Sequence, residues 1–328
     1  MLHIHNGDST ANTARQAAIP GEHFAFREAL IAGPTPSGLN DSDWLRLRAA
    51  HLTAAYGGGA EEQEQDLLRQ DETLSSYTAH DEVVLWLEHD LFCQVHLVYL
   101  LDWFAARTLN KTRLSLICIG EFPGIKNFHG LGELNTEQLA SLFSTRHEVT
   151  AAELRTAAAA WAAYCSPEPT TLESFLRSDT SAMPFLHSAL LCQLARFPSI
   201  RNGLGRIENR GLALIKDGIQ NFSELFPRFG NAEPGFGLGD SQFYLALKRL
   251  NEGHSPLLKI KDGAPNGRLD SEMIGKIAFE VTPAGQRVLK GEADFVELNG
   301  IDLWLGGVHL SGSNLWRWDE RKEEVVRG

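Results

Sequence analysis

The run Val83-Val84-Leu85-Trp86-Leu87 limits the possible folds more than any other stretch, and three ionisable residues, Glu88-His89-Asp90, follow it directly. The run shows no polar alternation, so a strand formed by it is buried on both faces. Such a strand is typical of a parallel sheet that is covered by helices on each side. Residues 91–106 are strongly apolar and predict a helix. The stretch therefore predicts a buried strand, a group of charged residues and a helix in immediate succession.

The beginning of the chain has the same layout. Residues 2–6 alternate around an apolar centre and predict a short strand that ends at Gly7. Asp8, Ser9 and Thr10 follow, and such residues are frequent at the first positions of helices. The remaining elements of this part are strands at 24–26 and 114–119 and helices at 41–56 and 61–77. Their order predicts an α/β fold with an open, doubly wound and mostly parallel N-terminal sheet.

The pattern of elements divides the chain into three regions. With 328 residues, of which 43% are hydrophobic, the chain is long enough for about two domains. We predict an α/β domain over residues 1–146, a helical section over 147–202 and a winged-helix-like α+β region over 203–328. The last region is expected to contain helices at 204–216 and 240–250, strands at 256–261 and 277–281 with a turn at 262–267, a helix after Thr282-Pro283, and strands at 303–310 and 315–318.

Charge and cysteine spacing restrict the partners and the location. The formal net charge is −12 and the isoelectric point is about 5.5, so the surface repels phosphate backbones and nucleic acid is an unlikely partner. No window approaches the roughly 20 apolar residues of a membrane span, and the first residues lack a signal-peptide pattern. The four cysteines are far apart and fit reduced thiols. We therefore expect a cytoplasmic protein without membrane contact, and the sequence leaves its oligomeric state open.

The charged residues after the buried strand are the first candidate site. In an open α/β sheet, ligands bind beyond the carboxyl ends of the strands, where the strand order reverses. If the strand at 83–87 lies beside the first strand, Asp8, Glu88 and Asp90 can together hold Mg²⁺ or Mn²⁺ through oxygen ligands. His89 is then predicted to act as a general acid or base near neutral pH, with Glu88 and Asp90 as its catalytic neighbours. The alternative is structural: Asp90 caps the helix that starts at residue 91, Glu88 forms an ion pair, and His89 lies on the surface.

The start of the first helix is a candidate anion site. Backbone N–H groups at a helix start bind phosphate and carboxylate groups, so Asn6, Gly7, Ser9 and Thr10 are predicted to contact a small anionic ligand. Arg27, just after the second strand, is expected to clamp this anion bidentately. The alternatives are an ordinary capped helix and a surface pair between Arg27 and its neighbour in the sequence, Glu28.

These residues predict that a phosphate-bearing small molecule or nucleotide is bound and undergoes metal-assisted hydrolysis or phosphoryl transfer. The alternative is a non-catalytic ligand-sensing regulator or protein-interaction module that acts through the winged-helix-like region. In that region, the helix at 240–250 offers only Gln242, Lys248 and Arg249 to a DNA groove, which favours protein contact over DNA binding. The sequence leaves open whether the protein is an enzyme.

Several motifs along most of the chain together resemble one bacterial family. They are residues 3–9, 26–28 with 33–34, 85–92, 202–204, 239–243, 304–308 and 316–319. This combination is similar to the family catalogued as domain of unknown function 1835. The family has no assigned activity, so the resemblance implies no particular reaction. In similar sequences the position of Cys93 often holds an acidic residue. If that residue were a metal ligand, this chain would lack one ligand of the site.

Overall fold

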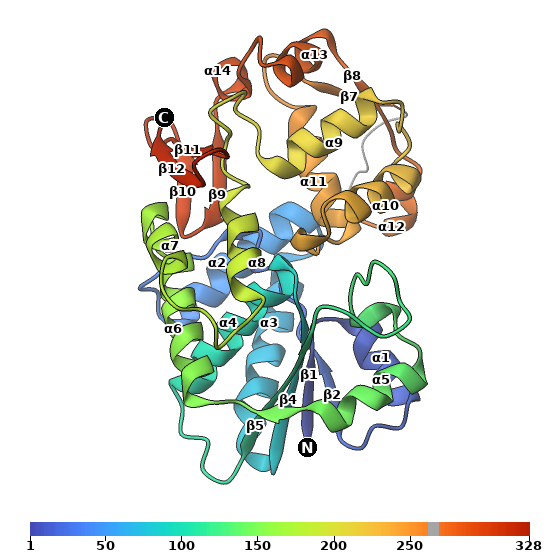
Figure 1. Cartoon of the computed structure of the whole chain (residues 1–328), viewed down its shortest axis with the longest axis vertical. Coiled ribbons are helices and arrows are strands. Elements are labelled where there is room, and N and C mark those ends of the chain that lie inside the picture. Colours follow the sequence, from blue (N-terminus) through green and yellow to red (C-terminus); the bar gives the residue numbers. More distant parts are fainter. Residues whose placement is uncertain (262–268) are drawn as a thin grey trace.

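The computed structural model describes residues 1–261 and 269–328, and the turn predicted at 262–267 lies outside the described residues. Figure 1 shows a lower lobe built around a parallel sheet and an upper lobe of helices and short strands. The N-terminus lies at the bottom of the sheet, so the strands run upwards and end facing the upper lobe (Figure 1).

The sheet has five strands in the order β2-β1-β4-β5-β6. The first four are parallel to their neighbours, and the short edge strand β6 is antiparallel to β5. This arrangement confirms the predicted mostly parallel α/β fold, and it places β4 directly beside β1, with Ile4 opposite Leu85. The strands are β1 (Leu2–His5), β2 (Glu22–Ala25), β4 (Glu82–Glu88), β5 (Arg113–Ile119) and β6 (His147–Glu148).

Helices cover both faces of the sheet, as the apolar run of β4 requires. All seven residues of β4 are buried. Val84 and Trp86 belong to the core on the side of α1 (Asp8–Gln16) and α5 (Thr136–Leu142). Val83, Leu85 and Leu87 belong to the core on the side of α4 (Leu91–Ala105). Successive side chains of a strand point to opposite faces, so one uninterrupted apolar run supplies both cores.

The helices of the middle section pack against the lower lobe. Ala157 and Ala160 are three residues apart on one face of α6 and are completely buried, which allows α6 to approach α4 closely. The helices of this section are α6 (Ala151–Tyr164), α7 (Pro169–Leu176) and α8 (Leu186–Leu194). The part of the chain before it also contains α2 (Asp41–Tyr56), α3 (Ala60–Ser75), η1 (Ser76–Ala79), η2 (Leu131–Glu133) and η3 (Phe143–Thr145).

The upper lobe has the helices predicted at 204–216 and 240–250 and strands within the predicted ranges 256–261 and 277–281. It also has a helix, α10, that the sequence did not predict, and two short unpredicted helices, α12 and α14. Pro227 lies inside α10 and hides its helical pattern, although Phe222, Leu225 and Phe229 are buried along one face. β7 and β8 pair antiparallel, and Thr282 caps α13 as predicted. The winged-helix-like assignment stays a prediction. The elements are α9 (Arg206–Lys216), α10 (Phe222–Ala232), η4 (Pro234–Phe236), α11 (Asp240–Leu250), β7 (Leu258–Lys261), α12 (Ser271–Gly275), β8 (Ala278–Val281), α13 (Pro283–Lys290) and α14 (Phe295–Asn299).

The single strand predicted at 303–310 is wrong, because the chain turns back at Gly306-Gly307. β9 (Asp302–Gly306) and β10 (Val308–Ser311) pair antiparallel instead. Gly306 has φ of +65°, and a Cβ on Gly307 would lie 1.9 Å from the carbonyl oxygen of Cys165, so this close turn needs glycine. The short strand β3 (Gly33–Pro34) pairs with β9, and β11 (Trp316–Asp319) with β12 (Glu324–Arg327). The β3–β9 pairing ties the loop after β2 to the C-terminal part.

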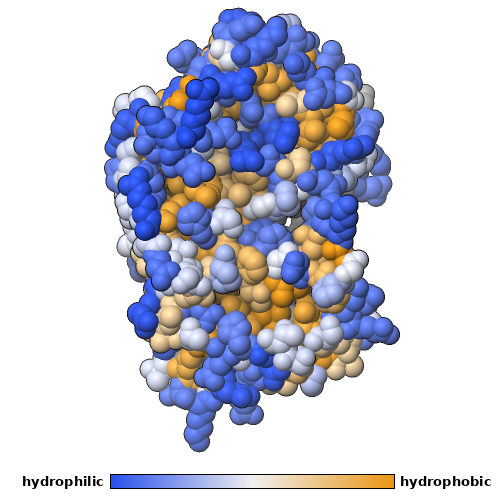
Figure 2. All heavy atoms as spheres, viewed as in Figure 1, coloured by the Kyte–Doolittle hydropathy of each residue, from blue (hydrophilic) through white to orange (hydrophobic). Residues whose placement is uncertain are grey.

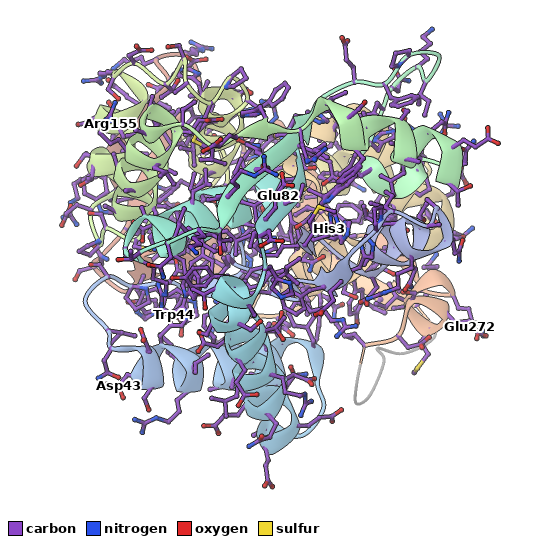
Figure 3. The ribbon with its side chains drawn as sticks, turned by 90° about the horizontal axis from the view of Figure 1, so that it is seen from below. His3, Asp43, Trp44, Glu82, Arg155 and Glu272 are labelled. Atoms are coloured by element: carbon purple, nitrogen blue, oxygen red, sulfur yellow. The ribbon has the colours of Figure 1, made fainter. Side chains whose placement is uncertain are left out.

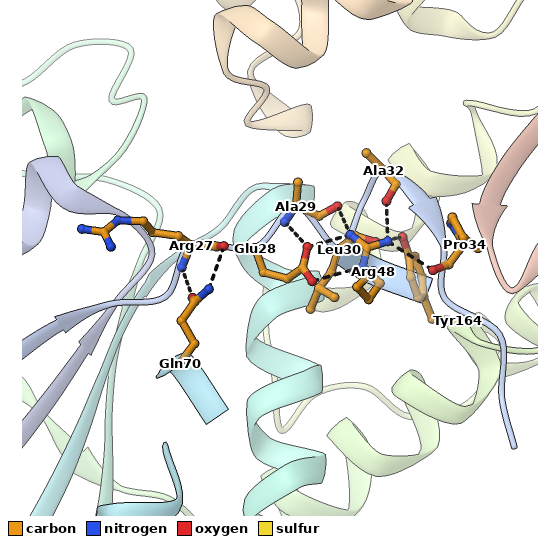
Figure 4. Close-up of polar contacts among 9 residues, drawn as sticks. All are labelled: Arg27, Glu28, Ala29, Leu30, Ala32, Pro34, Arg48, Gln70 and Tyr164. Atoms are coloured by element: carbon orange, nitrogen blue, oxygen red, sulfur yellow. Dashed lines mark hydrogen bonds and ion pairs between the residues drawn. The ribbon is translucent and has the colours of Figure 1, made fainter. Parts of the chain in front are cut away.

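A buried ion pair organises this loop. Arg48 on α2 is completely buried and donates from Nε and one NH2 group to the carboxylate of Glu28, at 3.1 and 2.7 Å. Its remaining hydrogen bonds go to the carbonyl oxygens of Ala29, Ala32 and Pro34 (Figure 4). Glu28 therefore pairs with Arg48, and the surface pair with Arg27 does not form.

Three histidines stack at the edge of the sheet between β1 and β2. Figure 3 shows His3 among closely packed side chains, whereas Asp43 and Glu272 lie at the periphery. The rings of His3 and His23 are 4.6 Å apart, and Trp86 donates from Nε1 to Nδ1 of His3 at 3.1 Å. Burial lowers the pKa of His3 to about 4 and that of His5 to about 2, so both are neutral at pH 7.

Within residues 1–261 and 269–328, no helix is both long and apolar enough to cross a membrane.

Candidate functional site

The carboxyl ends of β1 and β4 form the point where the strand order reverses. The chain moves from β1 to β2 on one side and then crosses to β4 on the other side of β1. A cavity of about 560 Å³ lies here between the lobes, and we call it the switch-point cavity. Figure 2 shows the surface hollowed between the two lobes. The residues of the cavity that carry the argument are Asn6, Glu88, Asp90, His129, Glu133 and Gly237.

Glu88 is held in a fixed position by groups from α4 and from the start of η2. Its Oε1 accepts a hydrogen bond of 2.6 Å from the backbone N–H of Leu131, and its Oε2 accepts from the thiol of Cys93. A Cβ on Gly130 would lie 2.9 Å from Oε1, and Gly130 has φ of +146°, so the loop can approach the carboxylate only with glycine there. Burial raises the pKa of Glu88.

Asp90 both caps a helix and faces the cavity. Its Oδ1 accepts from the backbone N–H of Cys93 at 2.9 Å, which is the capping role considered as the structural alternative. Burial and then the neighbouring charge of Glu88 raise the pKa of Asp90 to about 7. Gly237 of the upper lobe closes against this carboxylate, since a Cβ there would lie 2.0 Å from Oδ1.

Asn6 connects the end of β1 to the helix after β4. Its Nδ2 donates to Sγ of Cys93 at 2.7 Å, and its Oδ1 lies 2.7 Å from Nδ1 of His96. An amide oxygen only accepts, so Nδ1 of His96 carries the proton and Nε2 is left as an acceptor. Burial lowers the pKa of His96 to about 4, which keeps this ring neutral at pH 7.

The group that could hold a metal ion consists of Glu88, Asp90 and Cys93. One ligand atom from each lies within 4.8 Å of the others, and all three residues are buried. Over the described part of the chain, no lysine or arginine forms an ion pair with Glu88 or Asp90, so a cation would balance two otherwise uncompensated carboxylates. The carboxylates suit Mg²⁺ or Mn²⁺. Cys93 is a poorer ligand for these ions, because burial raises the pKa of its thiol and the thiol donates to Glu88.

Asp8 is not brought to these carboxylates. Arg27 donates from Nε and NH2 to the two oxygens of Asp8, at 2.7 and 2.5 Å, and both side chains are more than half exposed. The hydrogen bond from Arg27 lowers the pKa of Asp8. Asp8, the predicted metal ligand, and Arg27, the predicted anion clamp, therefore form an ion pair with each other.

A second cavity of about 560 Å³ continues from the first, and Asn6 lines both. We call it the α1 cavity, because Gly7 at the start of α1 lines it together with Arg27, Arg69 and Asp240. α1 and α11 both begin at a glycine N-cap without a side-chain cap. In α11 the backbone N–H of Ser241 instead donates to Oδ1 of Asp240, at 2.6 Å. Ser9 and Thr10 do not line this cavity: Thr10 is buried, and Ser9 lies beside Gly132.

His89 points away from both cavities. Its ring contacts Phe185 edge-to-face at 6.1 Å, and its Cβ lies beside Gly120. The imidazole that lines the switch-point cavity is that of His129, whose Nε2 lies 3.1 Å from Oδ1 of Asn231. Sequence reasoning gave His129 no role, although a histidine directly before a glycine in a polar loop is a weak signal of a site.

Comparison with models of known protein families and with curated proteins finds no family model and no curated sequence that matches this chain.

The contact between Gly237 and Asp90 gives a testable prediction. Gly237→Ala introduces a Cβ at φ of +62° and forces it against a buried carboxylate. Gly291→Ala is the matched control, because Gly291 is also left-handed (φ 77°, ψ 21°) and its added Cβ makes only ordinary contacts, at 3.6 Å or more. Both variants carry the backbone strain of about 1–2 kcal/mol, and Gly237→Ala should lose about 1–3 kcal/mol more through overpacking. Urea unfolding measures both losses, and equal losses would contradict the contact.

Proposed function

We propose that the cleft formed by the two cavities binds a phosphate-bearing small molecule, such as a nucleotide, and that Glu88 and Asp90 hold Mg²⁺ or Mn²⁺ for its hydrolysis or for phosphoryl transfer. One observation carries this proposal. Two buried carboxylates without a cationic partner face a cavity of about 560 Å³ at the reversal of strand order. Ligands of open α/β sheets bind at this place.

The charges along the cleft support the same ligand class. Carboxylates alone repel an anionic ligand, whereas Mg²⁺ is commonly held by one or two carboxylates together with the phosphates of a substrate. The α1 cavity offers the uncapped start of α1 to the phosphate. Arg27 and Arg69 also line it, and the phosphate would compete there with their exposed partners Asp8 and Asp66. Nucleic acid is not proposed as a partner, because the net charge of −12 repels a long phosphate backbone.

The residues of the chain have separate roles in this proposal. A bound divalent cation polarises phosphoryl oxygens and offsets negative charge that develops on them. Glu88 and Asp90 position it, and the hydrogen bond from Leu131 fixes the orientation of Glu88. His129 lines the cavity and is better placed than His89 to exchange a proton with the ligand. The upper lobe forms the facing wall of the cleft, where Gly237 lies against Asp90.

Calorimetric titration of the full chain with Mn²⁺ tests the proposal, first alone and then with ADP as the probe nucleotide. We expect one Mn²⁺ site, tighter ADP binding when Mn²⁺ is present, and an affinity for Mn²⁺ that falls at least about 10-fold in Asp90→Asn. Asparagine keeps the acceptor that caps α4, so this variant is expected to fold. Glu133→Gln, at the rim of the same cavity, is the control and should bind Mn²⁺ as the unmodified chain does. Equal affinity of Asp90→Asn and the unmodified chain for Mn²⁺ would overturn the proposal.

A further inference from the structure

A third cavity, of about 240 Å³, lies where the loop after β2 meets α2, α11 and β9. We call it the arginine cavity. Its apolar wall includes Leu238, Leu245 and Leu303, and its polar wall includes Arg196, His51 and Tyr56. A completely apolar cavity of about 150 Å³ accepts one benzene molecule, so this volume is sufficient for a small organic molecule. Neither Glu88 nor Asp90 lines it.

Arg196 gives this cavity an unbalanced positive charge. Its NH1 donates to the carbonyl oxygen of Ile31 at 2.6 Å and to Oε1 of Gln193 at 2.8 Å. In the described ranges no carboxylate forms an ion pair with it, in contrast to Arg249 in the same wall, which pairs with Glu208. Burial lowers the pKa of Arg196. A largely buried guanidinium without a counter-charge is costly, and an anion in the cavity would remove that cost.

Two further polar atoms of the wall lack partners. Nε2 of His51 and Oη of Tyr56 are buried and form no hydrogen bond within the described residues. Burial lowers the pKa of His51 to about 4, so the ring is neutral at pH 7. The ring of His51 is fixed by Gly33, where an added Cβ would lie 2.3 Å from it. Buried polar atoms normally have partners, and a ligand with more than one oxygen would provide them.

We propose that the arginine cavity binds a small organic acid, with its carboxylate on Arg196 and its hydrocarbon body against Leu238, Leu245 and Leu303. A planar carboxylate matches the planar fork of a guanidinium. The proposal goes beyond the function proposed above and does not depend on a metal ion. Tyr56 and Gln242 line both this cavity and the α1 cavity, so an acid bound here lies next to the phosphate-binding part of the cleft.

The test is calorimetric titration of the full chain with benzoate, phenylacetate and hexanoate, each paired with its neutral amide. We expect at least one acid to bind with one site per chain and its amide to bind at least about 30-fold more weakly, as expected when a buried charge pair is lost. Arg196→Met should weaken the acid by a similar factor. Arg201→Met is the matched control, because Arg201 also donates to a distant backbone carbonyl, that of Leu289, and does not line the cavity.

Ala246→Phe, on α11 in the wall of the cavity, provides a second variant that leaves Arg196 intact. It fills the volume and should abolish binding of the acid while the chain remains folded by circular dichroism. Three outcomes overturn the proposal: none of the three acids binds, an acid and its amide bind equally, or binding survives in Ala246→Phe. Inorganic phosphate is titrated in parallel, and phosphate binding with the same dependence on Arg196 would also overturn it, because the cavity would then belong to the phosphate site.

Discussion

Arg48→Met is expected to destabilise the protein by about 3–5 kcal/mol, because it leaves the carboxylate of Glu28 buried without a partner. The side chains of the pair are 0% and 5% exposed, so water does not replace the lost guanidinium. The carbonyl oxygens of Ala29, Ala32 and Pro34 lose their donor at the same time. Urea unfolding followed by circular dichroism measures the change in the free energy of unfolding.

The same helix provides the control for this prediction. Arg46 pairs with Asp43 at 2.7 Å, but the two side chains are 64% and 47% exposed. Arg46→Met should therefore change the free energy of unfolding by no more than about 1 kcal/mol. If both variants were equally stable, the buried pair would not determine the conformation of the loop after β2. The paired replacement Glu28→Leu with Arg48→Met should recover part of the loss, because no unpaired charge remains.

Arg48 also shows what the sequence could predict and what it could not. The helix at 41–56 was predicted with its correct bounds, since Asn40 is a strong cap and Gly57 ends the helix. The partner of Arg48 was not predicted, because Glu28 is 20 residues away and the neighbouring Arg27 is an equally plausible partner by spacing. Local signals determine where a helix begins and ends, whereas an ion pair across the fold depends on how elements pack.

In the candidate site, too, the features set by adjacent residues could be predicted, and the contacts between distant elements could not. The buried strand, the charges after it and the cap at Asp90 could be predicted from adjacent residues. The neighbouring position of β1 and β4 could only be stated as a condition, because strand order is decided by crossover connections. Gly237 could not be found at all, since it reaches Asp90 from a lobe more than 140 residues further along the chain. The ring contact of His89 is with Phe185, which is similarly remote.

Acidification is expected to destabilise the protein strongly below pH 6.5, because several buried histidines are neutral when folded and bind a proton only on unfolding. His3 shows the direction of the change in the free energy of unfolding with pH. Burial lowers the pKa of His3 from 6.5 to about 4, so its contribution to stability is complete above pH 6.5 and is lost as the pH falls towards 4. Each such group costs about 1.4 kcal/mol per pH unit within that window. The histidines that act in this way are His3, His5, His51 and His96.

Asp90 acts in the opposite direction, because its pKa is raised to about 7 and the folded chain binds this proton first. The variant His3→Gln separates the contribution of a histidine to the pH dependence from that of Asp90. In His3→Gln the amide can still accept from Nε1 of Trp86 and donate to the carbonyl oxygen of Pro20, so the two hydrogen bonds of His3 are kept. We expect the free energy of unfolding of His3→Gln to depend less on pH between 6 and 4.5, by about 1.4 kcal/mol per unit.

Chemical unfolding at half-unit intervals of pH gives the two slopes whose difference is predicted. His187→Gln is the control, because His187 is exposed on α8 and its replacement should leave the slope unchanged. Equal slopes for His3→Gln and the unmodified chain would show that His3 is protonated to the same extent in the folded and unfolded chain. Such a result would contradict the burial of the histidine stack between β1 and β2, where the side chain of His3 is 0% exposed.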